Sequence, residues 1–323
     1  RHAILRTSII KTAEGPLQRR FSAEHYQTEV IDLSRDPDAD RTLAQTLQRY
    51  ASLPFDLGSD YLLRSGIIQL ADESHVLAFT LHHIAADGWS VGLLQQQLAS
   101  LYLQYCQGEV TLADDTALQY ADFAHWEQLW LTPERLQLQQ QYWLTQLDGM
   151  PQLHSLPLDY NRPDKPAFAG SSCQRKLATA DLQRFNALCQ QHGASLYMGL
   201  QAALALLLAR LSQQSDIVIG TPVANREQPE LEQMLGFFAN TLVMRLQCDN
   251  EINFSQLLQH SRQVALDAYQ HQQLPFDQLV AQLQKERSAA YAPLFQIMLV
   301  LHNQQHGDWQ LAGLQLSEQE QLL

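Results

Sequence analysis

The chain has 323 residues, 46% of them hydrophobic, and carries a formal net charge of −13 with an isoelectric point near 5.3. This length and apolar content suffice to bury one large core or two smaller ones. The acidic balance disfavours nucleic acid as a partner, because such binding needs Lys and Arg to neutralise phosphates, and it disfavours anionic membrane surfaces for the same reason.

The first half of the chain mixes strand-like and helix-like periodicity, which indicates an α/β fold. The predicted elements are, in order, a strand over the first residues and another over 21–33, a helix over 40–50, strands over 66–70 and 76–81 joined by a turn, a helix from 88–90 to 105, and one or two helices over 120–147. Pro133 suits the first turn of the last of these helices, because proline is tolerated where no backbone donor is needed.

The composition changes after residue 148, where glycine and proline interrupt any regular period. Linkers between compact parts have this character. We therefore predict an N-terminal lobe over residues 1–150, a linker over 151–170 and a C-terminal lobe over 171–323.

The second half repeats a similar order of elements, so we expect two α/β lobes of related construction. The predicted elements are strands over 174–177, 217–220, 237–246 and 294–302 and helices over 181–192, 196–211 and 254–269. The apolar run 198–211 contains Gln201 and Arg210 and is shorter than the roughly 20 residues that a membrane span needs. We read it as a buried helix and expect no membrane association.

The four cysteines form no C-x-x-C pair. Widely spaced cysteines of this kind indicate reduced thiols, and we expect a cytoplasmic location. Five large aromatic residues, Trp89, Trp126, Trp143, Phe237 and Phe238, can serve as stacking platforms or as core. Core positions are the more common use of such side chains, and we predict them here.

Chemistry is concentrated where the strand 76–81 meets the following helix. Period-two alternation turns His82 and His83 to opposite faces, so one faces a cleft and the other is held by backbone or packed neighbours. Asp87 can cap the helix that follows it or pair with a buried arginine. Gly88 would let backbone approach the site.

Several other kinds of site are not supported by the sequence. Adjacent strand histidines diverge, and neither H-E-x-x-H nor H-x-x-E-H occurs, so we predict no metal site. The chain also lacks a P-loop and a G-x-G-x-x-G loop. A nucleotide-binding enzyme is therefore unsupported.

The order His82-His83-x-x-x-Asp87-Gly88 resembles the HHxxxDG motif of the condensation domains of nonribosomal peptide synthetases, within the chloramphenicol acetyltransferase-like superfamily. Further stretches resemble the family's motifs in the family's order: Arg1–Thr7, Tyr120–Trp126, Gly236–Leu242, His271–Phe276 and Pro293–Gln296.

The resemblance extends from Arg1 to about Asn303, and against the family pattern the chain is expected to be truncated at both ends. Three positions depart from that pattern. They are Ala3 in place of the common Glu, Ala239 in place of Val, and Ser288 in place of the Asp that often follows the arginine equivalent to Arg287. These departures put local ion pairs in doubt but leave the histidine motif intact.

The resemblance implies two chloramphenicol acetyltransferase-like lobes that form a pseudo-dimer with a tunnel between them. It implies formation of a peptide bond between a donor acyl or peptidyl thioester and the amine of an acceptor aminoacyl thioester. Both substrates would arrive on the phosphopantetheine arms of carrier domains, beside an adenylation domain of the same synthetase. No cofactor would be bound by the chain itself.

The resemblance also assigns roles to the motif. His83 is expected to be the reacting group, as a base, as a group that orients the amine or as a stabiliser of the tetrahedral intermediate. His82 is expected to be its structural partner. Asp87 is expected to form a bridge from one lobe to the other with an arginine of the segment 220–226, which is Arg226.

Three related functions compete with condensation. Epimerisation domains keep both histidines, although residues 236–242 look more like the condensing type. Heterocyclising relatives carry aspartate in place of the first histidine, and His82 argues against them. The third alternative is an inactive module that docks carrier domains, against which the intact motif argues.

Overall fold

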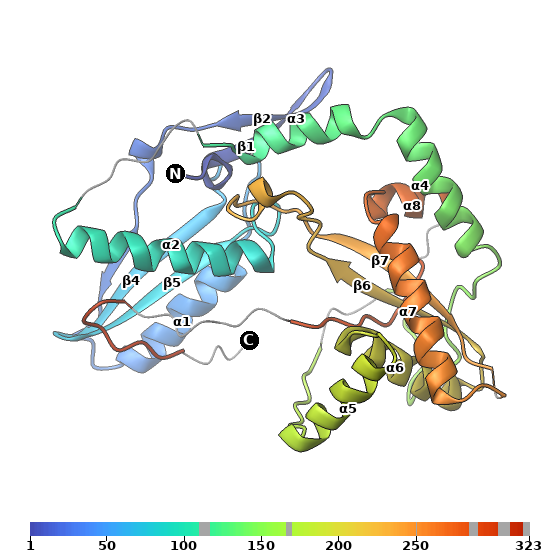
Figure 1. Cartoon of the computed structure of the whole chain (residues 1–323). Coiled ribbons are helices and arrows are strands. Elements are labelled where there is room, and N and C mark those ends of the chain that lie inside the picture. The colour runs from blue at the N-terminus through green and yellow to red at the C-terminus, as the bar shows by residue number, and fades with distance from the viewer. Residues whose placement is uncertain (110–116, 166–169, 250, 284–289, 303–310, 319–323) are drawn as a thin grey trace. The chain divides into compact units, whose positions relative to one another are not determined.

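The structure is a computed structural model that describes residues 1–109, 117–165, 170–249, 251–283, 290–302 and 311–318 (Figure 1). The predicted departure at Ser288 and its neighbour Arg287 lie outside these residues. The chain folds into two compact units. The first unit comprises residues 1–130, 226–238 and 304–323, and the second comprises 131–225 and 239–303.

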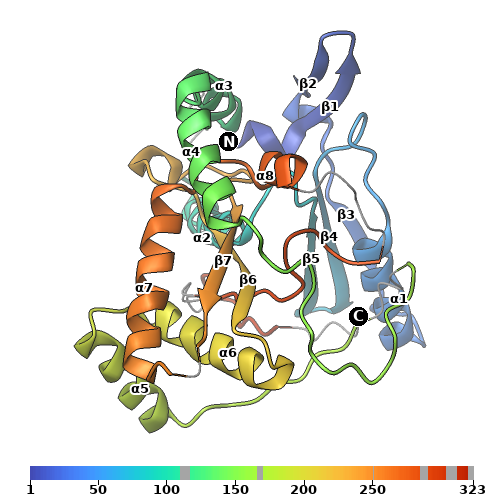
Figure 2. The ribbon, with the colours of Figure 1, turned by 90° about the vertical axis from the view of Figure 1, so that its right-hand side faces the viewer.

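A three-stranded sheet with strand order β3-β4-β5 forms the centre of the first unit. Strand β3 (Glu29–Asp32) pairs in parallel with β4 (Leu63–Ala71), and β4 pairs antiparallel with β5 (Ser74–Leu81). Helix α1 (Ala39–Ser52) lies against this sheet (Figures 1 and 2). Its apolar face buries Leu43 in a cluster with Leu33 and Ile68, which explains the helical spacing of apolar residues in this stretch.

The N-terminal segment differs from its predicted form. The first residues form a single 3-10 turn, η1 (Ala3–Arg6), and the strand β1 (Thr7–Thr12) begins only after it, paired with β2 (Gly15–Arg20). Within the predicted strand 21–33, only β3 pairs with another strand, which is β4. The Ser22 hydroxyl accepts a hydrogen bond from the Glu24 N–H at 3.3 Å and starts the turn η2 (Ala23–His25) instead.

Two further apolar clusters complete the first unit around α2 (Gly88–Cys106) and α3 (Tyr120–Trp130). Both contain residues from the distant segment 226–238, which includes the turn η3 (Pro229–Leu231). The clusters are formed by Ile4, Leu62, Ala85, Leu93 and Leu235, and by Phe123, Leu231, Met234 and Phe238. Burial of these side chains explains why the segment belongs to the first unit.

The second unit contains one antiparallel pair of strands and five helices in the described part of the chain. Strand β6 (Asp216–Val223) pairs with β7 (Asn240–Gln247), and Val223 lies opposite Asn240. The helices are α4 (Pro133–Gln146), α5 (Thr179–Gln191), α6 (Leu196–Ser212), α7 (Phe254–Gln270) and α8 (Phe276–Leu283). As expected, α4 begins at Pro133, and α6 is a largely buried helix.

Two of the strands predicted for this unit are absent from the described residues, and a third is shorter. Residues 174–177 form no strand, because they have no pairing partner. In the stretch 294–302 only Met298 forms a bridge, with Gly220. Strand β7 starts at Asn240 rather than at Phe237. Alternation of apolar residues predicts a strand only where a neighbouring strand supplies hydrogen bonds.

The two compact units do not coincide with the predicted segments. Helix α4, which we assigned to the lobe 1–150, packs in the second unit, and residues 226–238, which we assigned to the lobe 171–323, pack in the first. It remains a prediction that residues 1–150 and 171–323 form two related lobes with a tunnel between them.

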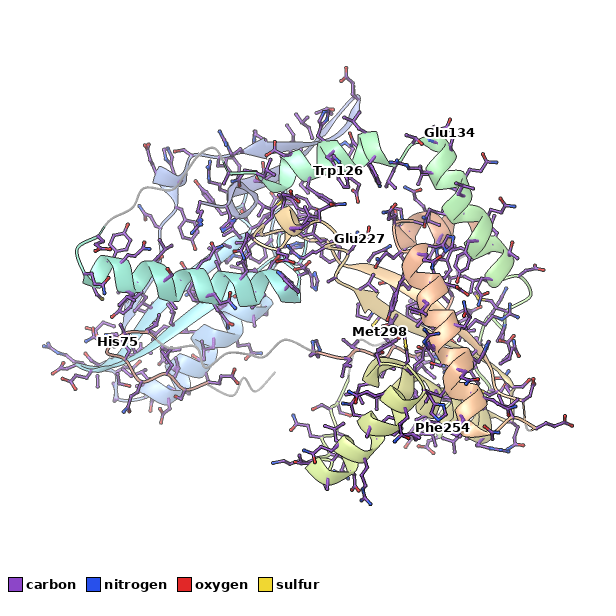
Figure 3. All side chains as sticks on the ribbon, viewed as in Figure 1. His75, Trp126, Glu134, Glu227, Phe254 and Met298 are labelled. Atoms are coloured by element: carbon purple, nitrogen blue, oxygen red, sulfur yellow. The ribbon has the colours of Figure 1, made fainter. Side chains whose placement is uncertain are left out.

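The tryptophans are only partly core. Trp143 is buried and its indole N–H donates to the carbonyl oxygen of His271 at 2.8 Å. In contrast, Trp89 is 37% exposed and Trp126, on α3 (Figure 3), is 38% exposed. Phe238 is buried as predicted, but Phe237 is 38% exposed.

No single helix among the described residues is long and apolar enough to cross a membrane. The helices α5 and α6, which meet at 101°, pass that test of length and composition only when taken together.

Asn240 connects the start of β7 to the segment before α8. Its side-chain nitrogen donates to the carbonyl oxygens of Gln272 at 2.7 Å and Leu274 at 2.8 Å. Its side-chain oxygen accepts from the N–H groups of Thr241 at 2.9 Å and Phe276 at 3.1 Å. Four hydrogen bonds to backbone therefore depend on one amide.

Replacing Asn240 by alanine is expected to lower the free energy of unfolding by roughly 1–3 kcal/mol, because four partly buried backbone groups lose their partners. Chemical denaturation followed by circular dichroism measures this change. The exposed Asn161, replaced by alanine, is the matched control and should have no effect. Equal stability of the two variants would show that the Asn240 amide does not hold this segment.

Candidate active site

The two adjacent histidines follow the last residue of β5 and differ in their surroundings. The backbone of His82 continues the sheet, since its N–H donates to the Leu62 carbonyl oxygen at 3.0 Å. Its Nδ1 accepts from the Ile84 N–H at 3.0 Å, and its ring packs edge-on against Phe55 with centroids 5.6 Å apart. The neutral His82 ring must therefore carry its proton on Nε2.

His83 begins the turn that leads to α2, and its side chain is exposed. Within the described part of the chain its imidazole has no hydrogen-bond partner, so both ring nitrogens are open to an incoming group. The ring of Phe237 lies beside it, with centroids 5.1 Å apart and planes at 78°. The two histidines thus face different surroundings, as predicted, although β5 ends at Leu81, before both of them.

Asp87 is 5% exposed, and both of its predicted structural roles are present together. It caps α2, because its Oδ1 accepts from the Ser90 N–H at 2.8 Å. It also pairs with Arg226, whose Nη2 lies 3.2 Å from Oδ1 and 3.4 Å from Oδ2. A third donor, the Phe238 N–H, lies 3.1 Å from Oδ2. A carboxylate with this set of donors accepts hydrogen bonds through both oxygens.

The Asp87–Arg226 ion pair joins distant stretches of sequence, but both residues lie in the first compact unit. That this pair joins the lobes 1–150 and 171–323 remains a prediction. Since the segment 226–238 buries apolar side chains in the first unit, the pair fixes that segment to the start of α2.

The Arg226 side chain is 2% exposed and makes contacts beyond Asp87. Its Nη1 donates to the carbonyl oxygens of Leu231 and Met234, the latter at 2.7 Å. Its guanidinium carbon lies 4.0 Å from the centre of the Phe238 ring. Burial lowers the pKa of Arg226, and the neighbouring Asp87 charge opposes that shift.

Ser90 belongs to the same network and was not predicted from the sequence. Its hydroxyl donates to the Gly236 carbonyl oxygen at 2.8 Å and accepts from the Gly236 N–H at 3.1 Å and from Arg226 Nη2 at 2.9 Å. A side-chain atom at Gly236 would overlap the ring of Tyr120, so only glycine fits there. The available signal was a serine three residues after a capping Asp, in the first turn of α2.

Gly88 is the predicted site residue that the structure supports least. A Cβ atom at this position would have no described protein atom within 4 Å, and the residue is exposed. Close approach of protein backbone therefore does not require glycine here.

Among the described residues, no group of three or more His, Cys, Asp or Glu side chains is placed so that it could hold a metal ion.

Known proteins resemble the chain along almost its whole length. The sequence profile described as Condensation domain matches residues 1–322. Malpinin synthetase of Mortierella alpina is 38% identical over 287 residues, which cover 89% of this chain and 4% of that protein. Tyrocidine synthase 3 of Brevibacillus parabrevis is 36% identical over 319 residues, which cover 98% of this chain and 5% of that protein. The chain therefore spans a small part of the length of such relatives.

Solved structures show the same fold. The X-domain in a complex of the X-domain and OxyB from teicoplanin biosynthesis matches with a TM-score of 0.82 at 29% identity, over 92% of this chain and 65% of that one. A four-domain nonribosomal peptide synthetase bound to AMP and glycine matches with a TM-score of 0.78 at 25% identity, over 93% of this chain and 22% of that one. The predicted α/β class is confirmed.

Proposed function

The chain belongs to the condensation-domain family of nonribosomal peptide synthetases, and we propose that it forms an amide bond between two carrier-bound substrates. The donor is an acyl or peptidyl thioester, and the acceptor is an aminoacyl thioester with a free α-amine. The observation that carries the proposal is the exposed imidazole of His83, which has no hydrogen-bond partner in the described part of the chain and lies at the end of β5.

The proposed reaction needs a neutral amine, a polarised carbonyl and alignment of the two. An α-amine has a pKa of about 7.7–8.0, so a substantial fraction is already neutral near pH 7.5. When the amine attacks the thioester carbonyl, its nitrogen becomes positively charged and must lose a proton. In our proposal a ring nitrogen of the neutral His83 accepts that proton as the new C–N bond forms. The thiolate of the donor arm then leaves as the tetrahedral intermediate collapses.

The other motif residues have supporting roles in this proposal. Asp87 accepts hydrogen bonds through both oxygens and is fixed by Arg226, which makes it a scaffold rather than a proton carrier. His82 holds the strand end through its backbone and its Nδ1. Gly88 would leave space beside the turn for a substrate arm, because no described atom would meet a Cβ there.

We also propose that both substrates arrive already activated on phosphopantetheine arms of donor and acceptor carrier domains, with the adenylation domain of the synthetase as the source of activation. The sequence has no P-loop. Thioesters supply the energy of the new amide bond, so the chain itself then requires neither ATP nor a bound cofactor.

A reconstituted reaction tests this function. The protein is mixed with two carrier domains that bear different aminoacyl phosphopantetheine arms, and products on the acceptor arm are identified by mass spectrometry. We expect a dipeptidyl thioester on the acceptor. Free amino acids with ATP in place of the loaded carriers should give no dipeptide, and a dipeptide from that mixture would contradict the proposal.

The same experiment separates the alternatives. An epimerisation domain would invert the α-carbon of a peptidyl arm without a second carrier, which chiral chromatography of the hydrolysed arm detects. An inactive module that docks carrier domains is the second candidate; the similar X-domain, solved in a complex with OxyB, is a relative that binds another protein. Tight binding of loaded carriers without any dipeptide or inversion would favour that function.

A further inference from the structure

Phe237 is an exposed aromatic residue at the candidate site to which the proposed reaction gives no role. Its ring lies edge-to-face with that of His83, with centroids 5.1 Å apart. Aromatic rings favour this arrangement at separations of about 4.5–7 Å. We propose that Phe237 is a positioning residue that fixes the orientation of the His83 imidazole; this inference rests on the proposed function of His83.

Among the described residues, His83 has no hydrogen bond and no second ring contact that would fix its imidazole. A histidine that transfers protons commonly has its second nitrogen held by a hydrogen bond, which sets tautomer and orientation. His83 has no such bond within the described residues, whereas His82 has both a hydrogen bond to Nδ1 and a ring contact with Phe55. The contact with Phe237 is therefore the restraint available to the His83 ring.

The backbone of Phe237 is held by hydrogen bonds on both sides and at its own carbonyl oxygen. Its carbonyl oxygen accepts a hydrogen bond from the Tyr120 hydroxyl at 2.8 Å. On one side Gly236 is bound through its N–H and carbonyl to the Ser90 hydroxyl, and on the other the Phe238 N–H donates to Asp87 at 3.1 Å. Three consecutive residues are thus anchored, which allows the Phe237 ring to act as a fixed wall.

The Phe237 side chain is not required for stability. Phe237 is 38% exposed, while its neighbours Leu235 and Phe238 are buried. The hydrogen bond from Tyr120 reaches the main chain and would survive any substitution of the side chain.

The Asp87–Arg226 network holds the segment that carries Phe237. The network therefore acts on His83 indirectly, through the Phe237 ring.

A set of variants tests this role in single-turnover reactions with two loaded carriers at saturating concentration. Phe237→Ala should lower the rate of dipeptide formation roughly ten- to hundredfold, because small misplacements of a reacting group have effects of this size. Phe237→Tyr, which keeps the ring, should restore most of the rate. The carrier concentrations for half-maximal rate should not change. Tyr105→Ala, at an exposed position of α2, is the control and should leave both rate and thermal stability unchanged.

A second background decides whether Phe237 acts through His83. In a His83→Ala protein the further change Phe237→Ala should have no effect on the residual rate. The positioning role is overturned if the loss is the same in both backgrounds, if it depends on the size of the loaded side chain, or if Phe237→Ala alone is fully active. If His83→Ala retains the wild-type rate, the proposed function of His83 fails instead, whatever the Phe237 variants do.

Discussion

Replacing Arg226 by alanine is expected to lower the free energy of unfolding of the first unit by about 3–5 kcal/mol, which is the cost of leaving a buried charge without its partner. The carboxylate that would lose its partner, Asp87, is 5% exposed, and the carbonyl oxygens of Leu231 and Met234 would lose donors as well. A loss of about 3–5 kcal/mol is a large part of the free energy of unfolding of a typical protein, which is about 5–15 kcal/mol. We therefore expect poor solubility or a clearly lower melting temperature.

A double-mutant cycle of Asp87→Ala, Arg226→Ala and the combined variant measures the coupling. Residues in one network depart from additivity, whereas independent residues do not. If Asp87 served only as a helix cap, its loss would cost about 0.5–2 kcal/mol and would not depend on Arg226. Additive changes in stability would refute the coupled pair.

The exposed pair Asp38–Arg41 is a matched control for this cycle. Its side chains are 58% and 72% exposed, and its charged atoms are 2.6 Å apart. Solvent-exposed pairs contribute a median of about 0–1 kcal/mol. Arg41→Ala should therefore change the melting temperature far less than Arg226→Ala, and an equal change would show that burial does not determine the effect.

Local patterns in the sequence predicted the frame of the candidate site. Apolar runs over 66–70 and 76–81 placed β4 and β5, and the helical spacing after Asp87 predicted a helix from 88–90, where α2 starts at Gly88. These elements depend on residues close in sequence, which is why periodicity sufficed. The different surroundings of His82 and His83 followed from the same alternation. The arginine partner of Asp87 came from the family resemblance instead.

Features that depend on long-range packing were not predictable in this way. The segment 226–238 leaves the second unit between β6 and β7, yet its apolar residues are buried in the first, and no local pattern indicates that partner. The hydrogen bonds of Ser90 to Gly236 and the contact of Phe237 with His83 exist only because this segment packs in the first unit. For the same reason the predicted lobe boundaries differ from the compact units, and Phe237 was wrongly predicted to be core.

Replacing His83 by alanine is expected to lower the rate of dipeptide formation by about 10²- to 10⁴-fold, which is the usual contribution of a general base. Because the side chain is exposed and makes no described hydrogen bond, stability should not change. His75, another exposed histidine on β5 (Figure 3), is the matched control. His75→Ala should retain the wild-type rate.

The most direct test of the proposed function is the single-turnover rate at which the protein transfers a donor aminoacyl group to the amine of a loaded acceptor carrier, compared between wild type and His83→Ala at equal folded concentration. The wild type should form a dipeptidyl thioester, and the variant should react at least about a hundredfold more slowly. A folded His83→Ala protein that forms the dipeptide at the wild-type rate would contradict the role of His83.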